Sequence, residues 1–453
     1  MQINFFTKFP GAAITLAITA WLPLFAQDTS TLNLETAIEL ALQNNHLLNV
    51  KKLQVNEKQQ KVNEDKVKYL PVIGIGGLYQ YNTNLPSLTI EQGRFGALPY
   101  GGILIPLPAV DETITMGKHD IYNAGVTLYQ PLTQLGKIKA GVQVTKTELK
   151  ISRIEENKTG FQIRQAVEKL YFGLLILQKQ IEEADIKVKL AGMKLKEAES
   201  ALLAGKATES SRYGLAASAA DEEQNLLKLR MQFDDYEADL KQLTGINAGV
   251  DLVLEPVPAE YLIEKTEVID TSLKKASIKN NDLQLAFLYK TKAEYSIRAS
   301  KFSYLPDLGL LGGYTYQEGT VIYPKNNTYV GASLKWNLQD MLSNRTVQRQ
   351  RIYVKEQAEE NLANTREQVN KDIAKAYRKL KQSEELIKVA GKVVEYRAED
   401  LKIRKNERIA GLNLESGLLS AKAAMAKSES DYFAAQLNYR IALSELKILT
   451  GSY

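Results

Sequence analysis

The chain has 453 residues, of which 44% are apolar and 25% are charged, a composition typical of folded protein and too apolar for a disordered chain. Its formal net charge is only +5 and no dense cluster of lysine and arginine stands out, so nucleic-acid binding has no support. It contains no cysteine, which excludes disulfides, thiolate metal sites, a cysteine nucleophile and a lipid-modified N-terminal cysteine.

Residues 1–26 have the features of a secretory signal peptide. Lys8 provides a positive charge, residues 11–25 form an apolar stretch, and Ala26 precedes a plausible cleavage site. The apolar stretch is shorter than the roughly 20 residues that a membrane-spanning helix needs. We therefore expect an exported chain without a lipid anchor, which crosses a membrane, if at all, only as β-strands.

Three helices are predicted in the first part of the mature chain. The first runs from Leu34 to Lys68 and ends before a proline, which cannot continue it. A long helix covers residues 135–203, with Gly205 in the turn that follows. The third covers residues 208–243, with Gly245 as its C-cap. The long helix would extend about 100 Å, so the first and third helices could lie end to end along it.

Two segments before the long helix, at about residues 72–81 and 122–132, alternate an apolar, aromatic-ended face with a small or polar face. Segments of this kind are typical of barrel strands that face lipid on one side and water on the other. The connection between them, residues 82–121, is rich in glycine and proline, so it is predicted to be an exposed loop.

The order of elements in residues 27–245 recurs in residues 268–453, after a linker at residues 246–267. The second copy again has two alternating segments, at about residues 307–317 and 328–338. The sequence therefore predicts a duplicated unit of long helices and a strand pair, mainly α-helical with membrane β-strands.

Repeated short motifs fix the alignment of the two copies. The Leu-Thr-Gly sequence that ends at Gly245 recurs at Gly451, an offset of 206 (451 − 245). The same offset relates the two Ala-Gly-x-x-x-Glu-Ser turns. Upstream, Tyr69 of a Tyr-Leu-Pro sequence matches Tyr304, an offset of 235 (304 − 69). The difference of 29 is the long connection in the first copy.

A pair of adjacent asparagines marks the first helix of each copy. Asn44-Asn45 matches Asn280-Asn281 with an offset of 236 (280 − 44), which differs by one from the offset at Tyr69. We therefore expect a one-residue slip between the two copies of this helix.

Four strands cannot close a barrel, since bacterial outer-membrane barrels have at least about eight. Open strand edges in lipid would leave backbone groups unpaired at a cost of several kcal/mol each. The chain must therefore oligomerise, although the residues do not fix the number of subunits. The residues predicted to face lipid are Ile73, Ile75, Tyr79, Tyr81, Val126, Leu128, Leu308, Leu310, Tyr314, Tyr316, Val330, Leu334 and Trp336.

The third helix carries a seam from Leu215 to Leu243 with alternating spacings of four and three residues. This heptad pattern indicates coiled-coil packing. Heptads alone are also compatible with a helical bundle, so a soluble periplasmic coiled-coil scaffold is an alternative. Membrane fractionation separates the two, because a scaffold would leave the membrane in a carbonate wash.

The layout closely resembles the TolC family of outer-membrane efflux proteins. The resemblance covers nearly the whole mature chain and rests on Leu34-Glu35-Thr36-Ala37, the asparagine pairs, the Tyr-Leu-Pro helix ends before glycine-rich strands, and the duplicated turn and Leu-Thr-Gly motifs. It implies a homotrimer with a 12-stranded β-barrel in the outer membrane and a long α-helical barrel in the periplasm.

The resemblance also implies partners and a role. An inner-membrane pump, reached through a periplasmic adaptor protein, would drive small molecules through this passive exit duct. Service as the exit duct of a type I protein secretion system is the alternative within the family. The cargo, the pump and the adaptor cannot be identified from the residues.

The two turns between long helices would then form the periplasmic tip, where adaptors dock and the tube closes. Family members with aspartate rings carry them just after the second turn, where this chain has Gly417 and Ser420, so an aspartate gate is not carried over. Glu209 and Glu415 lie at helix starts, where carboxylates are favoured, and are interpreted as capping or surface residues. The tip and gate candidates are Gly205, Glu209, Ser210, Gly411, Glu415, Gly417 and Ser420.

No pattern in the sequence indicates an enzyme. There is no nucleophile–base pair, phosphate-binding loop or metal motif in a sensible context, and His46 and His119 are far apart. The glycines at residues 74–77 lie in a predicted strand, which is the wrong setting for a nucleotide fingerprint. We expect no catalytic residues, no cofactor and no metal.

Overall fold

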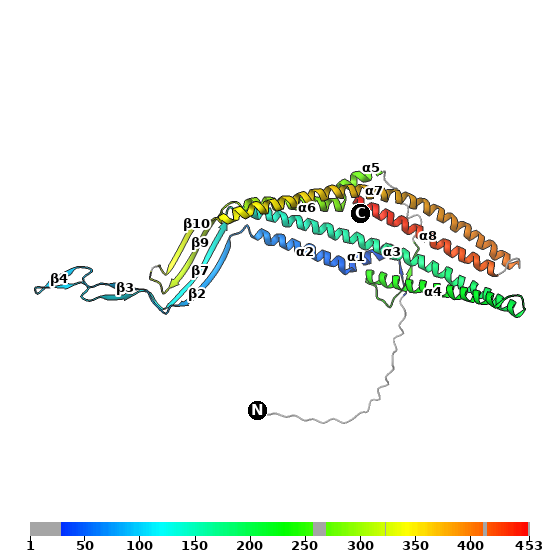
Figure 1. The fold of residues 1–453 in the computed structure, drawn as a ribbon, viewed down its shortest axis with the longest axis horizontal. Coiled ribbons are helices and arrows are strands. Elements are labelled where there is room, and N and C mark those ends of the chain that lie inside the picture. The colour runs from blue at the N-terminus through cyan, green and yellow to red at the C-terminus, as the bar shows by residue number, and fades with distance from the viewer. Residues whose placement is uncertain (1–28, 257–268, 322, 411–414, 452–453) are drawn as a thin grey trace, which may run out of the picture.

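The computed structural model describes residues 29–256, 269–321, 323–410 and 415–451. A four-stranded sheet lies toward one end, long helices form most of the length, and a narrow ribbon of strands projects beyond the sheet (Figure 1). The described helices are α1 (Leu34–Asn44), α2 (His46–Val67), α3 (Leu135–Leu203), α4 (Glu209–Thr244), α5 (Ile269–Lys279), α6 (Asn281–Phe302), α7 (Leu338–Ile409) and α8 (Glu415–Thr450).

The helices form a wall built from two equivalent halves. In the first half, α2 and α4 both pack along α3; in the second, α6 and α8 both pack along α7. The halves meet where α3 packs against α6 and α8. The third helix of the sequence analysis is α4, and its predicted seam packs against α3, with Leu226 and Leu240 buried. The long first-copy helix begins and ends where the sequence predicts.

The prediction of one continuous helix from Leu34 to Lys68 is wrong, because the chain breaks at Asn45. The side chain of Asn45 caps α2 by accepting a hydrogen bond from the backbone amide of Leu48 at 3.1 Å. The Asn44 side chain donates to the carbonyl of Thr244 at 2.8 Å, so the break is attached to the end of α4.

The same joint recurs in the second half. Asn280 caps α6 by accepting from the amide of Leu283 at 2.9 Å, and it also donates to the carbonyl of Leu449 at the end of α8. The equivalent of Asn45 is thus Asn280, an offset of 235 (280 − 45). The expected one-residue slip is therefore wrong, since α1 and α5, and α2 and α6, share this single offset.

Glycine is required at this joint. Gly245 ends α4 with a left-handed backbone (φ 75°), and a Cβ added there would lie 2.9 Å from the Cβ of Asn44. Gly451 is the counterpart, with φ 62° and a Cβ position 2.4 Å from the carbonyl oxygen of Lys279.

The four-stranded sheet is entirely antiparallel, in the order β10-β9-β7-β2. Its strands lie within three residues of the segments expected from the alternation. They are β2 (Val72–Tyr81), β7 (Asp120–Pro131), β9 (Asp307–Glu318) and β10 (Asn326–Lys335).

The connection predicted as a loop contains four strands that form the ribbon in Figure 1. The inner pair is β3 (Ser87–Ile90) with β6 (Glu112–Thr115), and the outer pair is β4 (Ala97–Tyr100) with β5 (Ile103–Pro106). Its glycines serve the turns that join these strands, so a high glycine content did not mean an irregular loop.

The segment expected as a linker begins with a strand. β8 (Asp251–Leu254) pairs in parallel with β1 (Thr29–Leu32). The buried hydroxyl of Tyr171 on α3 lies 2.8 Å from the carbonyl oxygen of Leu32 and 2.7 Å from that of Glu255. Burial raises the pKa of Tyr171 to about 12, so this hydroxyl remains a hydrogen-bond donor.

A charged pair is buried where the two halves meet. Arg440 on α8 donates to Glu168 on α3 at 3.2 Å, and the Glu168 side chain is only 3% exposed. Glu168 Oε2, Arg440 Nε and Gln436 Oε1 have no hydrogen-bond partner in the described residues. Burial raises the pKa of Glu168, and the positive charges of Arg440 and Arg164 oppose that rise.

Candidate functional site

The sheet has one apolar and exposed face. Cross-strand pairing places Ile75, Val126 and Tyr314 in one row. The same register puts twelve of the thirteen residues predicted to face lipid on this face, and Trp336 follows directly after β10. Each of the thirteen side chains is at least 36% exposed. An exposed apolar face of this size requires a partner that is not water.

The opposite face is richer in small and polar residues, although Leu78, Tyr129, Leu311 and Tyr329 also lie on it. It presents Asn123, Thr127 and Thr315, together with glycines. Gly309 lies against the ring of Tyr129, where an added Cβ would come within 2.4 Å of a ring atom. This face suits contact with water, as in the lumen of a barrel.

Tyrosines mark the end of the sheet that is distant from the helices. The hydroxyl of Tyr79 donates to Asp120 at 2.8 Å, and that of Tyr314 donates to Asn326 at 2.8 Å. Tyrosine has an apolar ring and a polar tip, and such rings are enriched where a membrane meets water.

Both flanks of the molecule are open. β2 and β10 are the edge strands of the sheet. On the β2 flank, α2 and α4 pack mainly on α3. On the β10 flank the outer helix is α7, which packs on α6 and α8.

The flank helices carry exposed apolar stripes. On α7, Leu386, Val389, Val393, Tyr396 and Ile403 are 42–70% exposed and follow heptad spacing. Sequence reasoning missed this stripe, although the spacings of three, four, three and seven residues are readable.

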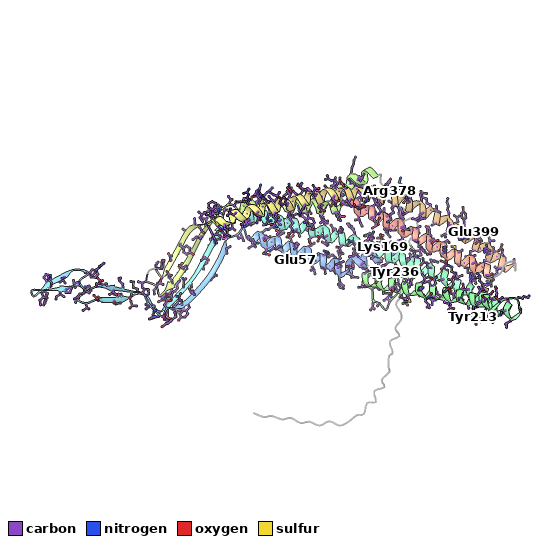
Figure 2. The ribbon with its side chains drawn as sticks, in the orientation of Figure 1. Glu57, Lys169, Tyr213, Tyr236, Arg378 and Glu399 are labelled. Carbon is purple, nitrogen blue, oxygen red and sulfur yellow. The ribbon has the colours of Figure 1, made fainter. Side chains whose placement is uncertain are left out.

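On α4 the exposed apolar side chains are Tyr213, Leu227 and Met231, at 59–66% exposure. Figure 2 shows Tyr213 near the end of α4 that lies beside the turn, and it shows Glu399 on α7, three residues after Tyr396. Leu227 lies 18 residues from the start of α4, and Val393 lies 16 residues from the end of α7. Both stripes therefore lie toward the end of the wall where the turns are.

The first tip turn is well defined. Gly205 has φ 67°, and Thr208 caps α4 by accepting from the amide of Ser211. Glu209 pairs with Arg212 at 3.1 Å within the same helix, and Ser210 is exposed. As interpreted from the sequence, Glu209 is a surface residue at a helix start.

The second tip turn falls at residues 411–414, so Gly411 lies outside the described residues. Glu415 forms an ion pair with Arg408, which joins the start of α8 to the end of α7. Gly417 is half-buried, and the exposed Ser420 donates to the carbonyl of Ser416 at 2.8 Å. The first turn, the end of α7 and the start of α8 lie at the same end of the wall (Figure 1).

The described part of the chain has neither a cluster of metal ligands nor a membrane-spanning helix. No group of three or more His, Cys, Asp or Glu side chains could hold a metal ion there. None of its helices combines the length and the apolar composition needed to cross a membrane.

Comparison with known proteins gives a consistent result. Residues 37–246 and 272–452 match the family described as "Outer membrane efflux protein". No curated protein matches the chain.

Solved structures share the fold. The outer membrane protein VceC of Vibrio cholerae has 16% identity and a TM-score of 0.64, with 92% of this chain and 96% of VceC covered. The CmeC outer membrane channel of Campylobacter jejuni has 14% identity and a TM-score of 0.69, with 92% and 85% covered. The MtrE outer membrane channel of Neisseria gonorrhoeae has 15% identity and a TM-score of 0.58, with 99% and 98% covered. The predicted fold, mainly helical with a duplicated unit, is confirmed.

Proposed function

The chain belongs to the outer membrane efflux protein family, a family of transport proteins and not of enzymes, and we propose that three copies assemble into one exit duct. The observation that carries this proposal is the pair of open flanks. A sheet with two edge strands and a wall with two apolar stripes are both completed by further copies of the same chain. Three copies supply twelve strands, enough to close a barrel.

The internal duplication supports a specific contact between copies. Within the chain, Leu419 at the start of α8 shares a buried cluster with Ile186 on α3, and Leu190 packs against that cluster. With the offset of 206, Leu419 corresponds to Tyr213 on α4 (419 − 206), and Leu190 corresponds to Tyr396 on α7 (190 + 206). The contact between repeats thus has a counterpart between copies, in which Tyr213 of one subunit lies against Tyr396 of the next.

The apolar face of the sheet is proposed to face outer-membrane lipid. Val330 is 89% exposed near the middle of β10, so Val330→Lys should destabilise the barrel by about 2–4 kcal/mol in a bilayer. Ser333→Lys is the matched control, because Ser333 lies on the opposite face of the same strand. Heat-induced loss of the folded band on gels measures both variants; equal loss in both would contradict the assigned faces.

The turn end of the helical wall, which carries the two tip turns, is proposed to gate the duct. The Arg408–Glu415 pair holds the second turn together, so Glu415→Ala should loosen it and increase the open fraction in planar-bilayer recordings. Glu209→Ala is the control, since the Glu209–Arg212 pair lies within one helix and bridges no turn. Wild-type conductance and open time in the Glu415 variant would count against a gate at this turn. The MtrE structure is of the open state of that channel, which supports a tube that opens and closes.

The remaining partners follow from the family. An inner-membrane pump and a periplasmic adaptor would drive small molecules through the duct, with residues 1–26 directing export and with no lipid anchor. Export of a polypeptide through a type I secretion machine is the alternative. The test is whether a strain deleted for this gene accumulates a fluorescent pump substrate and regains efflux from a plasmid copy. Unchanged accumulation, together with loss of a secreted polypeptide, would favour the alternative.

A further inference from the structure

The outer part of the ribbon is apolar on both faces. The register pairs Leu98 with Ile105 and Tyr100 with Ile103 on one face, and Pro99 with Leu104 on the other. Tyr100, Ile103 and Leu104 are 78%, 71% and 68% exposed in the single chain. A two-stranded ribbon has no core of its own and is at best marginally stable in water. Both of its faces therefore require a covering surface.

The inner part of the ribbon is different. Leu88 and Ile114 pair on one face, whereas Thr89 and Thr113 pair on the other, with 3.2 Å between their hydroxyl oxygens. This stalk has one mostly apolar side, which also carries Glu112 opposite Ile90 next to the outer part of the ribbon, and one hydroxyl-lined side suited to water. Its partner must therefore lie on one side of the stalk and surround the tip.

The charges of the ribbon discriminate between possible partners. Residues 95–110 contain no charged side chain. The flanking segments carry Glu91, Asp111 and Glu112 against Arg94, so the surroundings of the tip are net negative. An anionic lipid surface would repel this pattern. Contact between residues 95–110 of two copies places no charges against one another, provided that the acidic flanks remain in water.

The position of the ribbon favours another copy as well. The ribbon continues from β2, the edge strand at which the proposed neighbour pairs, and from β7. The other hairpin of each subunit has only residues 319–325 between its strands. Three long ribbons would therefore alternate with three short connections around the rim, which leaves space above the pore.

The ribbon is long enough to reach the pore axis. From residue 82 to the turn at Gly101 it contains about twenty residues, which span up to about 60 Å when extended. Twelve strands spaced about 4.8 Å apart and tilted by about 40° give a barrel radius on the order of 12 Å.

We propose that the apolar tips of three copies, residues 95–110, pack together on the axis at the end of the barrel distant from the helices and close its exit. The apolar sides of the stalks face one another and their threonine sides face water. This inference rests on the proposed trimer. The duct would then have a second barrier, at the opposite end from the tip turns.

Cross-linking tests the contact directly, because the chain has no native cysteine. Leu104→Cys should form disulfide-linked pairs in detergent-purified or membrane-embedded protein, and a water-soluble maleimide should label it about tenfold more slowly than Thr89→Cys. Thr89→Cys, on the wet side of the stalk, should stay unlinked. Tyr213→Cys combined with Tyr396→Cys reports the trimer independently of the ribbon.

The cross-links distinguish failure of the closed exit from failure of the trimer. If the Tyr213–Tyr396 link forms but Leu104→Cys stays unlinked and is labelled as fast as Thr89→Cys, the closed exit is wrong while the trimer stands. Quenching of a fluorophore on Leu104→Cys by brominated lipid would show that the membrane covers the tip instead. If the Tyr213–Tyr396 link is absent and the protein is monomeric, the proposed function itself fails.

Conductance tests the consequence. The variants are tested in the Glu415→Ala background, in which the proposed gate at the tip turns is loosened. Replacing residues 95–110 by Asn-Gly, a favoured two-residue hairpin turn, should raise single-channel conductance severalfold over Glu415→Ala alone. Leu104→Asp keeps the ribbon at full length and should raise conductance in the same direction, by placing three carboxylates among the ribbon ends. Conductance equal to that of Glu415→Ala in both variants, with the Tyr213–Tyr396 link intact, would overturn the proposal.

Discussion

Tyr396→Asp should convert the assembled channel into single chains. Tyr396 is 70% exposed in one copy and corresponds to Leu190, which packs against the buried cluster that contains Leu419 inside the chain. An aspartate in the equivalent contact between copies would be buried without a partner, at a cost of at least about 3 kcal/mol per interface. A closed ring repeats that cost three times. Light scattering on the detergent-purified protein should therefore show a monomer mass.

Glu395→Lys is the matched control for this prediction. Glu395 is exposed and directly precedes Tyr396, but it lies about 100° around the helix from it. The substitution therefore changes charge close to the stripe without entering the contact. The control should remain trimeric. Tyr213→Asp should behave like Tyr396→Asp, because the two residues meet across the same interface. A trimer that survives both aspartate variants would contradict the assigned contact.

Arg440→Ala should be among the most destabilising single substitutions in the helical wall. Removing Arg440 leaves Glu168, 3% exposed, without its charged partner. Breaking a buried pair in this way costs about 3–5 kcal/mol. The midpoint of thermal unfolding, followed by circular dichroism, should fall accordingly. Lys379→Ala is the control, since the Lys379–Glu445 pair is about 40% exposed and should contribute no more than about 1 kcal/mol.

The effect of Arg440→Ala should also depend on pH. Burial already raises the pKa of Glu168, and loss of the Arg440 charge raises it further. Because the folded chain then holds the proton more tightly than the unfolded chain, the carboxyl destabilises the fold increasingly as the pH rises from the unfolded to the folded pKa. The difference from wild type should shrink toward acid pH. Glu168→Gln in the Arg440→Ala background should remove that dependence; a constant difference at all pH values would contradict the buried charge.

Local signals in the sequence were sufficient for much of the fold. The α3 helix was predictable over residues 135–203 because Gly205 and Thr208 are turn and cap residues placed directly after it. The strands were predictable because alternation with period two has only one interpretation over ten residues. Duplication supplied independent confirmation, since each signal occurred twice at a fixed offset.

Other features were not predictable, for different physical reasons. The break at Asn45 was missed because apolar residues continue on both sides, and the reason for the break is the end of α4, 200 residues away. Glu168 and Arg440 are 272 residues apart, and a single sequence has no signal that pairs them. The alternation of Leu98 with Tyr100 was readable, but the surrounding glycines and prolines suggested a loop.

Only part of the predicted site follows from short-range patterns in the sequence. The apolar face of the sheet was predictable, because side chains two residues apart along a strand lie on the same face. Whether Glu415 controls opening depends on its pairing with Arg408 and on the behaviour of three subunits together, and neither is encoded by spacing along one chain.

The pairing of β1 with β8 sets an order of events during secretion. β1 lies at residues 29–32, and its partner β8 is complete by residue 254. A chain that emerges on the far side of the inner membrane from its N-terminus can therefore finish its first half before α5 has crossed. The finished half then offers α3 as a ready surface on which α6 and α8 can fold as they arrive. Secretion that stalls halfway would release a first half in which β1 and β8 are paired but β7 still lacks its partner β9. A chain lacking β1 would leave the edge of β8 uncovered from the start.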